Sequence, residues 1–245
     1  MTRHRQILLL AAAAVSLSVA PAMAQELSVS LGDGGSLSAR TIQLFVLLTV
    51  LSLAPGLAIM VTCFPFIVTV LSILRQAIGL QQSPPNMLIV SLAMFLTYFV
   101  MEPVFTAAWE QGVTPLVEEQ IDVETAFQRT LDPFRTFMAN RMDPETFEAM
   151  ASLRPAPEEI AAGPDAPISV LVPSFLLSEV SRAFQVGFLI FLPFLIIDLV
   201  VAAVLMSMGM MMVPPAIVSL PFKLAFFVIA DGWSLVAGGL VRSYS

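Results

Sequence analysis

Long runs of apolar residues without charge constrain this chain more than any other feature. Residues 41–74 contain no Asp, Glu, Lys or Arg, and Asp198 is the only charged residue between Arg182 and Lys223. A helix crosses a bilayer with about 20 consecutive apolar residues, so each run is long enough to span. Only 12% of the 245 residues are charged, whereas soluble domains carry about a quarter. We therefore expect an all-α membrane protein with about four long hydrophobic helices that form hairpins.

The N-terminus has the parts of a secretory signal peptide. Arginines precede an apolar stretch over residues 7–20, which is too short to span a bilayer comfortably. Ala22 and Ala24 then match the small-x-small cleavage pattern. Residues 1–24 are therefore predicted to be removed, which leaves Gln25 at the start of the mature chain. An uncleaved N-terminal anchor is the alternative.

Two residue counts restrict the chemistry of the mature chain. The one histidine, His4, lies inside the predicted signal peptide, and Cys63 is the one cysteine. We therefore expect no disulfide within the chain, no ordinary zinc site and no His-based catalytic triad. The sequence also offers no nucleophile–base pair and no cluster of metal ligands. Neither an enzyme activity nor a cofactor is predicted.

Prolines, glycines and charges divide the chain into segments. Pro55 and Pro65 predict that the first apolar run is a kinked or two-piece helix. The last apolar stretch, over residues 216–241, is predicted to be one span. The predicted segments are a flexible periplasmic lead over 25–40, a first kinked hairpin over 41–109, an acidic helical segment over 110–167 and a second hairpin over 168–245.

The segment over residues 110–167 carries nearly all of the net charge. It holds twelve acidic residues against four arginines, a net charge of −8, while the whole chain carries −7. Apolar residues between Val123 and Met138 recur at helical spacing. Asp143 and Pro144 suit the N-cap and the first position of a further helix. We expect a small helical segment outside the membrane.

The topology follows from the predicted signal peptide. A cleaved signal leaves the mature N-terminus outside, and four crossings then place the acidic segment and the C-terminus outside as well. The turns over residues 75–86 and 209–215 are expected inside. The positive-inside rule agrees through Arg75 and Lys223, but the acidic segment has no fewer arginines, so the signal peptide is the stronger argument.

Charged residues within apolar helices are candidates for a site. An ionised carboxylate at Asp198 costs roughly 2.5–3.5 kcal/mol unless it is paired or faces water. A hairpin folded at its central turn brings Asp198 within a helical turn of Lys223, so an ion pair is favoured over a proton relay. Glu179 and Arg182 are spaced to pair on one helix face. Asp231 is expected to cap or anchor the last helix near the outer interface.

Five of the 14 methionines fall within seven residues at a turn bounded by glycine and proline. Methionine is flexible and polarizable, and at a loop tip it has nothing of its own chain to pack against. Copies of the turn around an axis would close a pore by contact and dewetting. Chance clustering, or burial against a partner, is the alternative. The methionines are Met206, Met208, Met210, Met211 and Met212.

Several long runs resemble a known family. They are LRQAIGLQQSPPN followed by LAMFLTYFVMEPV, and the stretch that begins FQVGFLIFLPFLIIDLVVAAVLMSMGMMMVPP. Over essentially the whole chain they resemble the FliP family of flagellar export proteins and its SctR relatives in virulence type III secretion. The predicted signal peptide favours the flagellar branch. One difference is Phe66, because many members have a basic residue where this chain reads CFPF.

The resemblance implies a subunit of the protein export gate in the inner membrane, at the flagellar basal body. Several copies, in a pentamer-like ring, would join FliQ and FliR subunits and other export-apparatus membrane proteins. Unfolded flagellar proteins would pass through, and the methionine turn would be the pore gasket. The resemblance implies no cofactor and no nucleic acid. It also implies that some apolar helices are buried against sister subunits instead of lipid. A transporter that carries ions on Asp198 is the alternative from another class.

Overall fold

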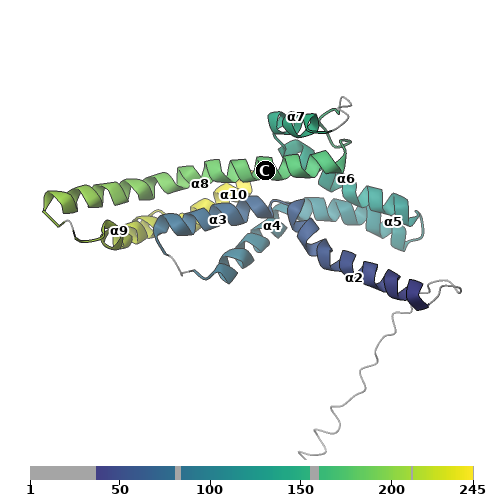
Figure 1. Ribbon diagram of the computed structural model, residues 1–245, viewed down its shortest axis with the longest axis horizontal. Helices are drawn as coiled ribbons and strands as arrows, with labels where there is room; N and C mark the ends of the chain where they lie inside the picture. The colour runs from purple at the N-terminus through teal and green to yellow at the C-terminus, as the bar shows by residue number, and fades with distance from the viewer. Residues whose placement is uncertain (1–36, 81–83, 155–159, 211, 245) are drawn as a thin grey trace, which may run out of the picture. The chain divides into compact units, whose positions relative to one another are not determined.

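The computed structural model describes residues 37–80, 84–154, 160–210 and 212–244. Helices are the only regular elements among these residues, which confirms the all-α expectation for the described part of the chain (Figure 1). The predicted signal cleavage at Ala22, Ala24 and Gln25 lies outside the described residues, as do residues 25–36 and Met211. The chain divides into two units, over residues 1–49 and 50–245.

The first apolar run forms two helices, α2 (Leu37–Met60) and α3 (Phe64–Ile78). Pro55 lies inside α2, while Pro65 lies in the first turn of α3, where a missing N–H breaks no hydrogen bond. Helix α3 ends at Gly79, whose φ of +88° suits a residue without a Cβ atom. The two-piece alternative of the sequence prediction is confirmed.

The next helices form the second half of the first hairpin and the acidic segment. Helix α4 (Asn86–Ala108) continues through the π-helix η1 (Trp109–Val113) into α5 (Thr114–Val117). After a turn follow α6 (Val123–Arg141) and α7 (Pro144–Ser152), which confirm the helices predicted for the acidic segment.

Helix α8 (Ile168–Ser207) is 40 residues long. At 1.5 Å per residue it measures about 60 Å, whereas the hydrocarbon core of a bilayer is about 30 Å thick. A helix of this length extends well beyond one membrane crossing unless it is strongly tilted. Glu179 and Arg182 lie in its first half, and the stretch that follows them is apolar.

The last apolar stretch is broken, which differs from the single span predicted over residues 216–241. Helices α9 (Pro215–Ile229) and α10 (Gly232–Arg242) meet at an angle of 61°. The break falls at Asp231, whose φ of +47° and ψ of 50° belong to the left-handed region. Since a helix cannot continue through a left-handed residue, a new helix starts in another direction.

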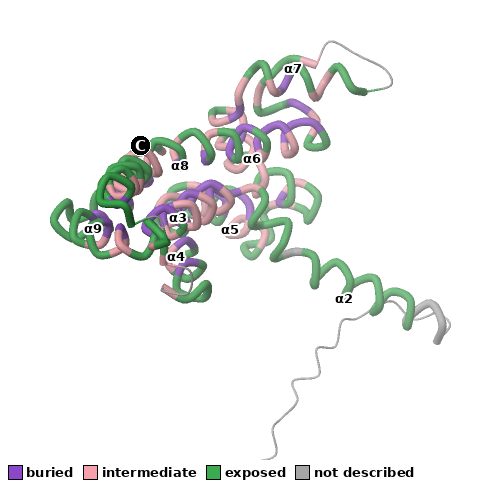
Figure 2. Tube along the Cα trace, turned by 60° about the vertical axis from the view of Figure 1, so that its left-hand side comes forward, coloured by how far each residue is buried: buried purple, intermediate pink, exposed green. Residues whose placement is uncertain are grey.

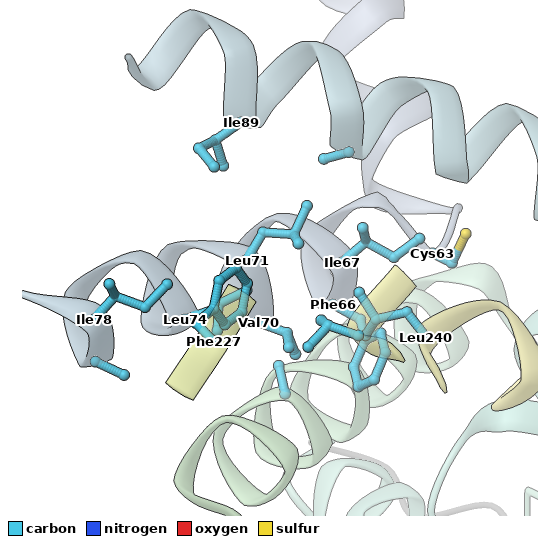
Figure 3. Close-up of a cluster of buried hydrophobic side chains, with 14 of the residues drawn as sticks. Cys63, Phe66, Ile67, Val70, Leu71, Leu74, Ile78, Ile89, Phe227 and Leu240 are labelled. Carbon is cyan, nitrogen blue, oxygen red and sulfur yellow. The ribbon is translucent and has the colours of Figure 1, made fainter. Parts of the chain in front are cut away.

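The core of the unit over residues 50–245 is built around α3. One face of α3 is buried at helical spacing, and α8, α4 and α9 contact it. Figure 3 shows its side chains directed toward Ile89 of α4, Phe227 of α9 and Leu240 of α10. The buried residues of α3 are Phe66, Ile67, Val70, Leu71, Leu74, Ala77 and Ile78.

A second buried cluster joins the acidic segment to the start of α8. It contains Met138 of α6, Phe147 of α7, and Leu171 and Phe175 of α8. Asp143 is the N-cap of α7, and its carboxylate accepts a hydrogen bond from the Thr146 N–H at 3.0 Å. The acidic segment is therefore a packed part of this unit and not a separate appendage.

The long helices leave much apolar surface uncovered. Among the residues that the structure describes, three helical stretches are long and apolar enough to cross a membrane, or four if the bent pair of α9 and α10 counts as one. Figure 2 shows buried residues along α3 and long exposed stretches on α8. Surface of this kind needs lipid or other protein chains to cover it. Its exposed members on α8 include Phe184, Phe188, Leu189, Ile196, Leu199 and Val200.

Candidate functional site

The methionine turn connects α8 to α9 and has ordered ends. Gly209, with φ of +76°, follows the last turn of α8, and its N–H donates to Met206 O at 3.1 Å. The Met210 N–H donates to Leu205 O at 3.0 Å, so two carbonyls at the helix end are satisfied by backbone donors. The turn leads to Pro215, the first residue of α9. The backbone therefore fixes where the side chains of Met206, Met208 and Met210 emerge.

The side chains of Met206, Met208, Met210 and Met212 are exposed. Met206 and Met208 are more than half exposed, and Met212 is 97% exposed. Met208 and Met210 also line an apolar groove of about 580 Å³ between α8 and α9, together with Val204 and other aliphatic residues. The turn therefore offers a flexible apolar surface that its own chain does not cover.

A polar network lies between α8 and α9 behind the turn. Lys223 of α9 donates to Asp198 Oδ2 of α8 at 2.6 Å. Ser219 Oγ donates to Asp198 Oδ1 at 2.5 Å, so both carboxylate oxygens accept a hydrogen bond. Lys223 also donates to Ala77 O at 3.1 Å, near the end of α3. The structure thus brings together the two residues of the predicted pair and adds two partners.

The network fixes the base of the hairpin. The side chain of Lys223 is 7% exposed and that of Asp198 is 32% exposed. Asp198 precedes Met208 by ten positions, or about 15 Å along the helix. A buried ammonium needs its partners, because an unpaired charge in an apolar interior is costly. The ion pair therefore joins α8 to α9, and the hydrogen bond from Lys223 to Ala77 O adds α3.

A second charged cluster surrounds Glu179, whose side chain is completely buried. Oε1 lies 3.3 Å from Arg141 Nη2 at the end of α6 and 3.4 Å from Arg182 Nη1 on its own helix. The hydroxyl of Tyr244 donates to Oε2. Burial, and then the neighbouring Glu179 carboxylate, raise the pKa of the Tyr244 hydroxyl, which stays protonated as a donor.

Comparison with known proteins identifies the family. The FliP family profile matches residues 47–240. The chain belongs to the FliP family. It is 50% identical over its whole length to the flagellar biosynthetic protein FliP of Caulobacter vibrioides, covering 92% of that protein. It is 51% identical over 86% of both chains to FliP of Agrobacterium fabrum, and 41% identical over the full length of both chains to FliP of Aquifex aeolicus.

Membership of the FliP family and the long apolar helices make this chain a membrane component of flagellar biosynthesis. The match covers α3 to α9 and the polar network between them. Membership of the family assigns no role to any single residue. The roles of Asp198, Glu179 and the methionines are therefore argued from their geometry.

The structure assigns partners that local spacing did not predict. Arg182 is near Glu179, as the spacing indicated, but Arg141 and Tyr244 complete that cluster from distant positions. Asp231 stands at the N-cap position of α10 without a side-chain cap hydrogen bond. Its left-handed backbone marks the bend between α9 and α10.

Among the described residues, no group of three or more His, Cys, Asp or Glu side chains is placed to hold a metal ion. Cys63 is fully buried at the start of α3, where its thiol faces Thr97 O at 4.0 Å. Phe66 is buried in the core beside Tyr244.

Proposed function

We propose that this chain is a subunit of the flagellar type III protein export gate and that its methionine turn closes the pore. The observation that carries the proposal is the turn itself: ordered helix ends present Met206, Met208, Met210 and Met212 with exposed side chains. Several flexible apolar side chains brought together around an axis exclude water and ions, yet they deform when a polypeptide passes. No catalytic step is needed for this role.

The proposed gate needs several chains. The apolar faces of α4 and α8 are too extensive for one chain to cover. Copies of this chain, in a pentamer-like ring, together with FliQ and FliR subunits and other export-apparatus membrane proteins, are the proposed partners. Unfolded flagellar proteins are the proposed cargo, and no nucleic acid is involved.

The proposed location is the bacterial inner membrane at the flagellar basal body. The mature N-terminus and the acidic segment lie in the periplasm, and the methionine turn faces the cytoplasmic side. The concentration of negative charge in residues 110–167 supports an aqueous location for that segment. The length of α8, about 60 Å, supports a subunit that projects beyond the bilayer.

The gasket is tested by small-ion leakage. We expect cells that carry Met208→Ala, Met210→Ala and Met212→Ala to leak small ions several-fold faster while filament export persists, because smaller side chains leave a gap on the axis. Met87→Ala is the matched control, since Met87 is 82% exposed but lies on α4, far from the turn in sequence. Leakage equal to that of the wild type would contradict the gasket role.

An ion carrier that uses Asp198 is less well supported. Both of its carboxylate oxygens already accept hydrogen bonds from Ser219 and Lys223, as expected of a residue that holds two helices together. A carrier group instead needs a partner that it releases during transport. The same geometry favours a structural role for the pair in the proposed gate.

A further inference from the structure

The two residues that follow α10 are fastened to three other helices. The ring of Tyr244 stands edge-on to Phe66 of α3, with centroids 5.6 Å apart and planes at 77°. It is stacked on Phe137 of α6, with centroids 6.1 Å apart and planes at 17°. Such geometries are the favoured ones for aromatic pairs. A short stretch of chain thus joins α3 to the acidic segment.

Polar contacts also hold Ser243 and Tyr244 in place. The Arg141 guanidinium lies 4.0 Å from the centroid of the Tyr244 ring, in cation–π contact, and Arg141 Nη1 donates to Ser243 O at 2.8 Å. The Tyr244 hydroxyl donates to Glu179, which Arg182 also contacts. Glu179 is buried and needs these donors, because its carboxylate has no access to water.

The other end of α10 is a bend. Asp231 is one of two residues other than glycine with positive φ among the described residues. Left-handed backbone is unfavourable for such a residue, and here it sets the 61° angle between α9 and α10. Helix α10 thus begins at a bend, and the two residues that follow its end contact α3, α6 and α8.

We propose that Ser243 and Tyr244 form a strap that fastens α10 to α3, α6 and α8, and that its release lets α10 swing about Asp231. Tyr244 alone contacts α3, α6 and α8, so its loss removes most of the attachment and leaves the Arg141 hydrogen bond to Ser243 O. Buried Glu179 accepts the hydrogen bond from the Tyr244 hydroxyl, and Arg141 contacts both residues of the strap. The strap is independent of the proposed gasket, because the strap follows α10 whereas the methionine turn precedes α9.

The chain contains its own reporter for the opening of the strap. Cys63 is the one thiol and is fully buried. It precedes α3 directly and lies one helical turn before Phe66, on which the Tyr244 ring rests. Leu240 of α10 belongs to the same buried cluster as Cys63 and Phe66 (Figure 3). The thiol itself faces Thr97 O of α4, and we expect movement of α10 away from α3 to loosen the shared cluster and so to expose it.

The experiment measures the rate at which N-ethylmaleimide alkylates Cys63 in the full-length protein, purified in detergent under native conditions and followed by mass spectrometry. The wild type is expected to react slowly. Tyr244→Ala is expected to raise the rate about tenfold, because local opening governs access to a buried group. Tyr244→Phe keeps the ring contacts but loses the hydrogen bond to Glu179, and it is expected to raise the rate about threefold.

Phe147→Ala is the matched control. Phe147 is 1% exposed and belongs to the second buried cluster, so its loss creates a cavity in that cluster, which meets the strap through Phe137. Its alkylation rate is expected to equal that of the wild type. A wild-type alkylation rate in Tyr244→Ala would overturn the proposal. So would an alkylation rate in Phe147→Ala as high as that in Tyr244→Ala. If Tyr244→Ala does not accumulate, Tyr244→Phe decides, and a wild-type rate in that variant overturns the proposal.

Discussion

At the scale of single residues, one ion pair tests how this chain tolerates charge in an apolar interior. Asp198→Asn leaves the buried ammonium of Lys223 without its counter-ion. We expect a loss of about 3 kcal/mol, the lower end for breaking a buried pair, because Asp198 keeps some contact with solvent. The measurement is the midpoint of thermal unfolding in detergent, together with the amount of assembled complex on a native gel.

The controls separate a structural pair from a proton relay. Ser219→Ala removes one hydrogen bond to Asp198 and is expected to cost about 1 kcal/mol. Exchange of the charges, Asp198→Lys with Lys223→Asp, is expected to recover part of the loss, because residues in contact are coupled. A relay makes the opposite prediction for Asp198→Asn: full assembly without transport. That outcome would rule out the structural role.

Asp143 gives the acidic segment a pH-dependent helix end. The Thr146 hydroxyl, and then its backbone N–H, hold the pKa of Asp143 below its ordinary value of 3.8. Because the folded pKa is depressed, the cap stabilises the fold above about pH 4 and is lost as the pH falls through the folded pKa. We expect Asp143→Ala to lower the unfolding midpoint at pH 7 and the gap from the wild type to shrink at pH 3.

Asp132→Ala is the comparison for this cap, because Asp132 lies in the middle of α6 and caps no helix end. Its unfolding midpoint is expected to stay close to that of the wild type at pH 7. A constant gap between the wild type and Asp143→Ala from pH 7 to pH 3 would show that the carboxylate charge of Asp143 does not stabilise the cap.

At the scale of elements, the contact between η1 and α6 depends on one glycine. A Cβ atom at Gly112 would lie 2.0 Å from Thr130 Oγ1 and 2.8 Å from Thr130 N. Since the backbone of α6 has to move, we expect Gly112→Ala to cost about 1–3 kcal/mol in unfolding free energy. Gly163→Ala, where nothing lies within 4 Å of the added atom, is expected to change it by less than about 0.5 kcal/mol. Equal stability of the two variants would contradict this packing argument.

The elements also show where the sequence is informative. Helical spacing predicts α6, and the types of Asp143 and Pro144 predict the start of α7, because both signals are local. The Asp198 and Lys223 pair follows from the geometry of a hairpin with a marked turn. The bend at Asp231 was not predicted, since aspartate seldom adopts left-handed backbone. Nor does any spacing connect Glu179 with Arg141 and Tyr244, which only the packing of distant helices brings together.

At the scale of the whole molecule, the uneven distribution of charge bears on how the chain is oriented in the membrane. The net charge of −8 over residues 110–167 favours water on that side, while the methionine turn carries no charge. The proposed topology places these two segments on opposite faces of the inner membrane. In a Cys63→Ala background, single cysteines introduced by Gly163→Cys and Met212→Cys mark the two faces. Both positions are exposed or open enough to take a label.

We expect a membrane-impermeant maleimide to label Gly163→Cys in intact spheroplasts and Met212→Cys only after the membrane is permeabilised. Labelling of both variants after permeabilisation is the control that each thiol is reactive. The reverse pattern would place the acidic segment in the cytoplasm and remove the basis for the predicted signal cleavage, while leaving the fold unchanged. Labelling of both in intact spheroplasts would instead show that the methionine turn is reached from outside, which a closed gasket on the cytoplasmic side does not allow.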